Sequence, residues 1–170
     1  MIKQKGSLLL EINMFFFLFA ILFSTFSQGM IQLWDNVDRV KDHIFMGRVA
    51  RDLLAIMEYQ LTFYTREAVL QESSGNSILH CTTLGQAKKR SFFCQKYPQS
   101  SNFGFYQKTQ VLGRNPGVNP LSPPDMGVTC FHIEKLSPFM VRVNFTLTVL
   151  ATGRHKVFTG ILYLRNGTVL

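Results

Sequence analysis

Residues 7–26 read SLLLEINMFFFLFAILFSTF and contain a single charged side chain, Glu11. A helix of this length extends about 30 Å, which is the thickness of the hydrocarbon core of a bilayer. The stretch therefore predicts a membrane-spanning helix. Lys3 and Lys5 precede it closely, and the positive-inside rule then predicts that the N-terminus stays in the cytoplasm while the rest of the chain lies outside it.

Three other interpretations of this stretch remain open at this point. It resembles the core of a secretory signal peptide, with a cleavage site near residues 25–27. It also fits a plain membrane anchor or a buried core helix. Glu11 separates these interpretations, because a carboxylate inside an apolar membrane helix costs about 2.5 kcal/mol or more unless a cation neutralises it, and a signal peptide has no use for that penalty.

Residues 5–11 read KGSLLLE and lead directly into the apolar run. This motif resembles the prepilin signal of type IV pilins and type II secretion pseudopilins. In that family a short basic leader ends in Gly, a membrane peptidase cuts after it, and Glu is the fifth residue of the mature chain. The resemblance implies a leader over 1–6, cleavage between Gly6 and Ser7, N-methylation of Ser7, and pairing of Glu11 with the N-terminal amine of a neighbouring subunit. Two features depart from the family: Ser7 stands where Phe or Met is usual, and no proline precedes Pro98.

Apolar residues continue at three- and four-residue steps over 27–72, with charged side chains between them. This spacing predicts an amphipathic helix that prolongs the membrane segment. The apolar stripe changes phase at Gly47, so we expect the helix to pack on its own head domain rather than to form a coiled coil. The residues Ser73, Ser74, Gly75 and Asn76 predict its end.

Residues 73–170 alternate apolar and polar side chains, as strands do. The expected strands are 78–82, 91–95, 103–112, 128–135, 141–149 and 156–164, the last two forming a hairpin around Gly153, with a Pro-rich loop over 115–124. The sequence therefore predicts an α+β fold, with a long N-terminal helix packed on an antiparallel sheet. This layout is similar to the pilin fold. The order of segments over 104–164 resembles minor pseudopilins of the J type and competence pseudopilins of the ComGF kind.

The chain has 170 residues and a formal charge of +8, with 46% hydrophobic and 16% charged residues, which excludes a disordered polyelectrolyte. The head over 73–170 holds eleven basic residues against Asp125 and Glu134. The run Lys88, Lys89, Arg90 and Lys96 interleaves with aromatic residues. Such a run can contact nucleic acid, acidic lipid headgroups or an acidic partner, or it can be a solvated loop whose aromatics face the core.

The head shows no pattern that predicts catalysis or a cofactor. No phosphate-binding loop or hydrolase motif occurs. Asp125 and Glu134 are the two acidic residues of the head, which is too few for a calcium site and unfavourable for paired-carboxylate catalysis. The spacing of His80, Cys81, Cys94, Cys130 and His132 matches no standard zinc pattern. Cys81 and Cys94 form a disulfide or remain buried free thiols, and either way Cys130 is left unpaired.

Together these features predict a non-enzymatic assembly protein without a cofactor. The resemblance implies a minor pseudopilin of a type II secretion pseudopilus, anchored in the cytoplasmic membrane by one span, with its head in the periplasm. Its implied partners are the major and minor pseudopilins, the prepilin peptidase and the assembly platform of the inner membrane. Three alternatives stay open: a competence or type IV pilus subunit for DNA uptake, an anchored envelope protein of another kind, and an enzyme secreted after signal cleavage.

Overall fold

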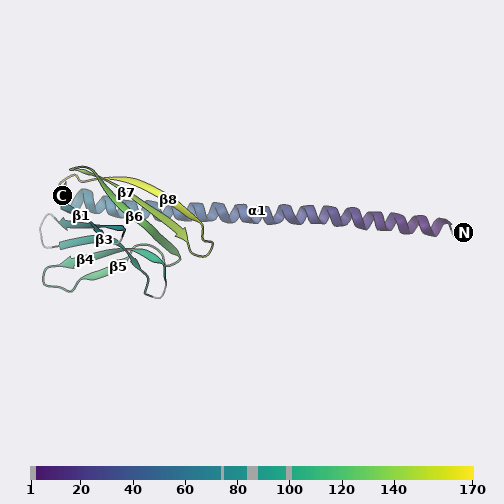
Figure 1. Ribbon diagram of the computed structural model, residues 1–170, viewed down its shortest axis with the longest axis horizontal. Coiled ribbons are helices and arrows are strands. Elements are labelled where there is room, and N and C mark those ends of the chain that lie inside the picture. The colour runs from purple at the N-terminus through teal and green to yellow at the C-terminus, as the bar shows by residue number, and fades with distance from the viewer. Residues whose placement is uncertain (1–2, 74, 84–87, 99–100) are drawn as a thin grey trace. The chain divides into compact units, whose positions relative to one another are not determined.

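The computed structural model describes residues 3–73, 75–83, 88–98 and 101–170. Within these ranges the chain forms one long helix followed by strands, as Figure 1 shows. The elements are α1 (Lys3–Tyr64), β1 (Thr65–Ser73), β2 (Asn76–Thr83), β3 (Lys88–Lys96), β4 (Phe103–Val111), β5 (Gly117–Pro120), β6 (Met126–Ser137), β7 (Met140–Val149), β8 (His155–Tyr163) and β9 (Thr168–Val169). The predicted α+β class is confirmed.

The helix ends earlier than the predicted boundary at residue 72. α1 stops at Tyr64, and the residues that follow form β1, which pairs antiparallel with β2. The segment 65–73 contains several good helix formers, but pairing with β2 and burial of Thr65 and Ala68 override this weak local preference. Gly75 has φ +80° and belongs to the β1–β2 turn, where the sequence pattern indicated a helix end.

The chain divides into two compact units, 1–43 and 44–170, which share α1. In the first unit the large apolar side chains described along the helix are exposed, and the rings of Phe15, Phe19 and Phe23 stack in succession. By length and composition α1 is able to cross a membrane. After Glu11 the next charged residue along the helix is Asp35, which pairs with Arg39 at 2.8 Å.

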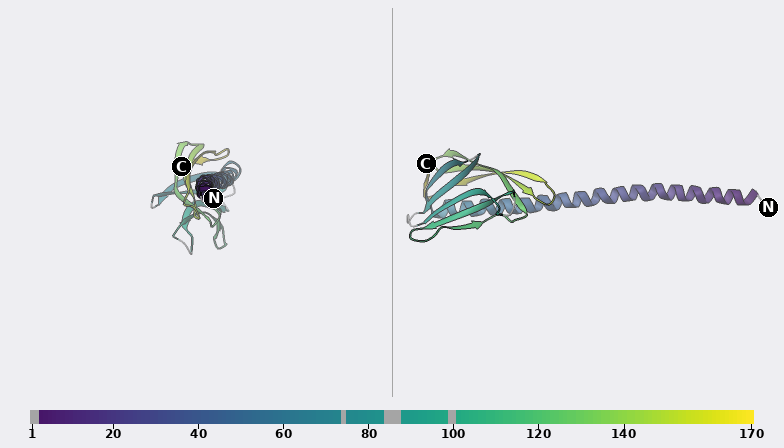
Figure 2. Two further views of the ribbon diagram at one scale, coloured as in Figure 1. Left: turned by 90° about the vertical axis from the view of Figure 1, so that its right-hand side faces the viewer. Right: turned by 60° about the horizontal axis from the view of Figure 1, so that its bottom comes forward.

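The second unit contains two sheets, which Figure 2 shows as separate groups of strands. The larger has the order β5-β4-β3-β2-β1-β9, and the smaller has the order β6-β7-β8. All pairs are antiparallel except β1–β9, which is parallel, so the single antiparallel sheet of the prediction is wrong in this detail. The predicted hairpin is confirmed as β7–β8. β5 lies inside the predicted Pro-rich loop, and its Pro120 is tolerated because β5 is an edge strand.

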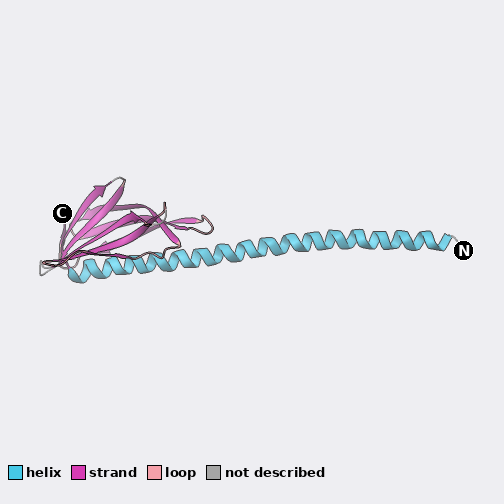
Figure 3. Ribbon diagram, turned by 90° about the horizontal axis from the view of Figure 1, so that it is seen from below, coloured by secondary structure: helices cyan, strands magenta, loops and turns pink. Residues whose placement is uncertain are grey.

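The core lies between the second part of α1 and the sheets; Figure 3 shows the strands on one side of these helical turns. The helix contributes Met46, Val49, Ala50, Leu53, Met57 and Leu61, all buried. The predicted packing of the helix on the head is therefore confirmed for these residues. It is wrong for Leu33, Trp34, Val37, Val40 and Ile44, which the same apolar pattern included and which are exposed.

A β-bulge in β6 decides which residues of that strand enter the core. Thr129 pairs with Thr146, but His132 pairs with Asn144, so one extra residue is inserted between them. Cys130 takes up the insertion with φ 53° and remains exposed, and Phe131 turns inward. The backbone N–H of Phe131 donates to Asn76 Oδ1 at 3.1 Å, which satisfies a group that the bulge removes from the ladder.

Candidate functional site

The predicted processing motif lies on the first turns of α1. Gly6 and Ser7 belong to the helical backbone, and Glu11 follows as an exposed residue. Leu8 and Phe15, one turn before and after Glu11, are 61% and 67% exposed. Among the residues whose side chains the structure describes, no cation lies within ion-pair distance of Glu11. The carboxylate thus stands in an apolar surface without a described partner.

The predicted basic run Lys88, Lys89, Arg90 and Lys96 does not form one surface. Three of its members are near neighbours in β3, and successive side chains of a strand point to opposite faces of the sheet. Lys88 and Arg90 therefore lie on the side that faces α1, and Lys89 lies on the other side. Lys96 ends the strand opposite Phe103. The expected polyanion patch is corrected accordingly, because the alternation of the strand places Lys89 on the face opposite to Lys88, Arg90 and Lys96.

Arg90 contacts the end of α1 and does not open onto the outer face of the sheet. Its guanidinium carbon lies 5.7 Å from the centre of the Tyr64 ring at the end of α1, within the range of a cation–π contact. Its Nε and Nη1 atoms are buried and have no hydrogen-bond partner among the described residues. The half-buried Arg90 thus contacts the end of α1, on the side of the sheet opposite to Lys89.

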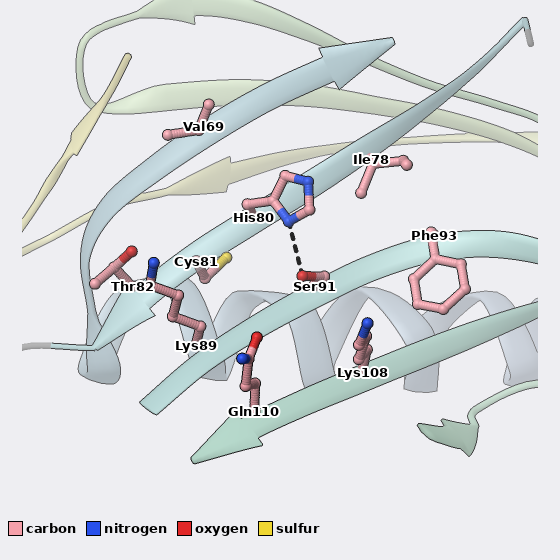
Figure 4. A pocket seen from close by; sticks show the side chains of 10 residues that line it. All are labelled: Val69, Ile78, His80, Cys81, Thr82, Lys89, Ser91, Phe93, Lys108 and Gln110. Carbon is pink, nitrogen blue, oxygen red and sulfur yellow. Dashed lines mark hydrogen bonds between the residues drawn. The ribbon is translucent and has the colours of Figure 1, made fainter. Parts of the chain in front are cut away.

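Lys89 opens instead onto a groove on the outer face of the six-stranded sheet, which Figure 4 shows. The groove has a volume of about 510 Å³. Four strands line it with cationic, polar and apolar side chains: Val69 from β1; Ile78, His80, Cys81 and Thr82 from β2; Lys89, Ser91 and Phe93 from β3; Lys108 and Gln110 from β4. Sequence analysis did not single out Lys108 or Gln110, because only the β3–β4 register brings them beside Lys89.

The pairing registers arrange these side chains in rows across the sheet. One row runs through Val69, His80, Ser91 and Lys108, and the next through Thr82, Lys89 and Gln110. Lys89 and Lys108 are therefore diagonal neighbours on adjacent strands, with Cα atoms about 7–8 Å apart or less. Figure 4 shows the amine of Lys89 beside Thr82 and the amine of Lys108 beside Phe93, with Ser91 and Gln110 between the two side chains.

His80 lies one strand away from Lys89 and two strands away from Lys108, and it is held by two hydrogen bonds. Its Nε2 donates to Gln71 Oε1 at 3.1 Å, and the Ser91 hydroxyl donates to its Nδ1 at 2.8 Å. Burial lowers the pKa of His80 below its usual 6.5, and the charges of Lys108 and Lys89 lower it further. The imidazole is thus neutral near pH 7, and the positive charge of the groove resides on the two lysines.

The cysteines do not form the disulfide that the sequence left open. Cys81 lies opposite Arg90 in the β2–β3 ladder, so Cys94 is displaced from it by four residues, about 13 Å along the strand. A disulfide requires Cα atoms within about 7 Å. Both thiols are free, and burial raises the pKa of each to about 12. Cys130 is free and exposed.

The side chains considered for zinc are also dispersed. His80 lies on the outer face of the six-stranded sheet, and Cys81 and Cys94 have buried thiols. His132 approaches Ser77 and Glu72 at 3.5 and 4.0 Å. Over the described part of the chain, no three His, Cys, Asp or Glu side chains gather at metal-binding distance.

Comparisons with known proteins were made at three levels. No family model, no curated protein sequence and no solved structure matches this chain. Two features on the molecule therefore carry the functional argument. One is the apolar helix with Glu11, and the other is the outer groove of the head.

Proposed function

We propose that this chain is a minor pseudopilin, a structural subunit of a type II secretion pseudopilus, and not an enzyme. The observation that carries the proposal is Glu11, five residues after Gly6, standing exposed in an apolar helix without a described cation beside it. The same helix continues into a head in which antiparallel strands cover its second part. A cleaved leader, an apolar stem and a globular head are the parts that such a subunit needs.

The charge of Glu11 gives the stem a reason to assemble. An unpaired carboxylate at this depth costs about 2.5–3.5 kcal/mol in a bilayer. Cleavage after Gly6 creates an amine on Ser7 at nearly the same depth, so a neighbouring subunit provides the missing cation. Pairing removes the penalty in only one axial register of the two stems, because apolar contacts alone would permit sliding. Glu11 thereby sets the axial offset between neighbouring subunits. The energy for filament assembly comes from the assembly platform and not from this chain.

The proposal also assigns orientation and partners. Lys3 and Lys5 hold the leader on the cytoplasmic side, where the prepilin peptidase acts, and the head lies in the periplasm. The stem contacts other major and minor pseudopilins once it leaves the bilayer. The exposed apolar residues between positions 30 and 44 extend this contact surface beyond the membrane span.

Processing is tested by the mass of the mature chain. A chain that begins at Ser7 with one added methyl group supports the proposal. Gly6→Val should leave the leader attached, because a β-branched side chain replaces the small residue at the cut. Gly29→Val is the matched control: it makes the same change in the same helix, at a site with no atom within 4 Å of the new Cβ. A wild-type chain that keeps Met1, or that begins near Gln28, refutes pilin processing.

The role of Glu11 is tested separately by Glu11→Gln. Removal of the charge should leave membrane insertion intact or improve it, and it should reduce recovery of the chain in filaments about tenfold or more, since about 2 kcal/mol of pairing is lost. Asp52→Asn, an exposed helical acid outside the apolar run, should assemble normally. Full assembly of Glu11→Gln would remove the basis of the proposal.

The secretion assignment itself is tested in cells. A type II pseudopilus moves folded proteins out of the cell, whereas a competence pseudopilus takes up DNA. Deletion of the gene should abolish protein export and leave transformation unchanged. The reverse result would assign the chain to DNA uptake, and normal export together with normal transformation would fit an envelope protein of another kind.

A further inference from the structure

We infer that the outer groove of the six-stranded sheet binds an extended, acidic peptide segment of a partner protein, whose carboxylates pair with Lys89 and Lys108. The inference concerns the head alone and does not depend on the processing of the leader. It assigns to Lys89 and Lys108 a role that neither the stem nor the core explains.

The first argument is the charge that the groove leaves uncompensated. Lys89 and Lys108 are diagonal neighbours, and none of the ten residues that line the groove is acidic. Each ion pair found among the described residues lies elsewhere. Glu67 occupies the row of Lys89, but Thr82 stands between them on the intervening strand. An anionic segment that passes over both lysines would compensate this charge.

The second argument is the spacing of Lys89 and Lys108 along the backbones of β3 and β4. Alternate residues of an extended peptide lie on the same side of the chain, about 6.6–6.8 Å apart. This distance matches the separation expected for diagonal neighbours on adjacent strands. Two glutamates separated by one residue can therefore reach Lys89 and Lys108 together without bending the peptide.

The third argument is the floor of the groove. Val69, Ile78 and Phe93 form an apolar surface beside the lysines, and Val69 is 41% exposed. Apolar side chains of a bound peptide would cover it. The groove thus interleaves cationic and apolar side chains, as expected for a peptide that carries both kinds of residue.

The same features disfavour a nucleic acid in this groove. Binding of single strands relies on open aromatic faces on which bases stack. Phe93 instead stacks on Tyr106 at 6.1 Å, and Tyr106 is buried. The arginine of the basic run, which would fork around a phosphate, faces Tyr64 on the other side of the sheet. Two flexible ammonium groups above an apolar floor favour carboxylates.

The experiment is calorimetric titration of the full chain, held in zwitterionic detergent micelles, with an acetylated and amidated hexapeptide of alternating Glu and Val. The same hexapeptide with Gln in place of Glu and a short oligothymidylate are the comparison probes. The double variant K89Q/K108Q removes both amines of the groove. The double variant K88Q/K96Q removes the same number of charges from β3 without touching the groove, and K89R/K108R keeps the charge.

The expected result is that the Glu-Val peptide binds, and that K89Q/K108Q lowers its affinity about tenfold. K88Q/K96Q should change the affinity by less than about twofold, K89R/K108R should largely retain it, and the Gln-Val peptide should not bind. Equal losses in the two Gln double variants would overturn the inference, because they would indicate a general effect of net charge. It would equally be overturned if no Glu-Val binding occurred, or if oligothymidylate bound through Lys89 and Lys108 in its place. Near-ultraviolet circular dichroism verifies that each variant is folded.

Discussion

The contact of α1 with β8 offers a direct test of how the head is held on the helix. Gly160 in β8 lies beneath Leu54 of α1, and a Cβ built on Gly160 would stand 2.6 and 2.9 Å from the two Leu54 methyl carbons. Ordinary carbon–carbon contacts are about 3.5–4.0 Å. Gly160→Ala therefore forces Leu54 out of its position or moves the strand away from the helix.

The expected change in the free energy of unfolding of Gly160→Ala has two opposing contributions. Overpacking a tight site by one methyl group typically destabilises a protein by about 1–3 kcal/mol. Replacing glycine also reduces the entropy of the unfolded chain, which returns about 0.4–1 kcal/mol. We expect Gly160→Ala to lower the free energy of unfolding by about 1–2 kcal/mol. Gly117→Ala is the control, since Gly117 has no atom within 4 Å of its built Cβ, and it should change stability by less than about 0.5 kcal/mol.

The assay is urea unfolding of the full chain in nonionic detergent micelles, followed by the near-ultraviolet circular dichroism of the tyrosines in the head. A double-mutant cycle with Leu54→Ala assigns the cause, because the truncated side chain leaves room for the new methyl group. The double variant should be more stable than the sum of the two single effects by about 1–2 kcal/mol. Additive effects, or an unchanged stability of Gly160→Ala, would show that Leu54 does not rest on Gly160.

Two further predictions concern the cysteines. Cys130 has φ 53° in the bulge of β6, where side chains are strained; Cys130→Gly should keep or raise the urea midpoint, whereas the β-branched Cys130→Val should lose about 1–2 kcal/mol, and equal midpoints would contradict the strain. Burial raises the pKa of Cys81 and Cys94 from 9.0 to about 12, so the folded chain retains protons that the unfolded chain releases. Stability should be unaffected by these thiols below pH 9 and fall by about 1.4 kcal/mol per pH unit per thiol between pH 9 and 12. A Cys81→Val/Cys94→Val variant should show a shallower fall, and an unchanged slope would exclude the thiols as its cause.

Local sequence patterns were sufficient to predict the helix and most of the strands. The apolar run around Phe15–Phe23 predicted a helix by composition, and the strict alternation over 141–149 predicted β7, because both signals depend on neighbours in sequence. β1 was missed because its residues also suit a helix, and only the partner strand β2 decides between the two. β9, with two residues, is too short to carry a period and exists through its pairing with β1.

The candidate sites also differ in whether local sequence patterns or strand pairing identify them. Gly6, Ser7 and Glu11 were recognisable from spacing alone, because their chemistry depends on positions along one helix. The basic run was recognisable as a charge cluster, but its division between Arg90 and Lys89, and the approach of Lys108 to Lys89, depend on strand register. The amino-acid sequence by itself determined the apolar helix, its single acid Glu11 and the α+β class, since these follow from local composition and periodicity. Tertiary structure alone decided which face each lysine presents and which cysteines stand apart, because hydrogen-bonded register joins residues that no local period relates.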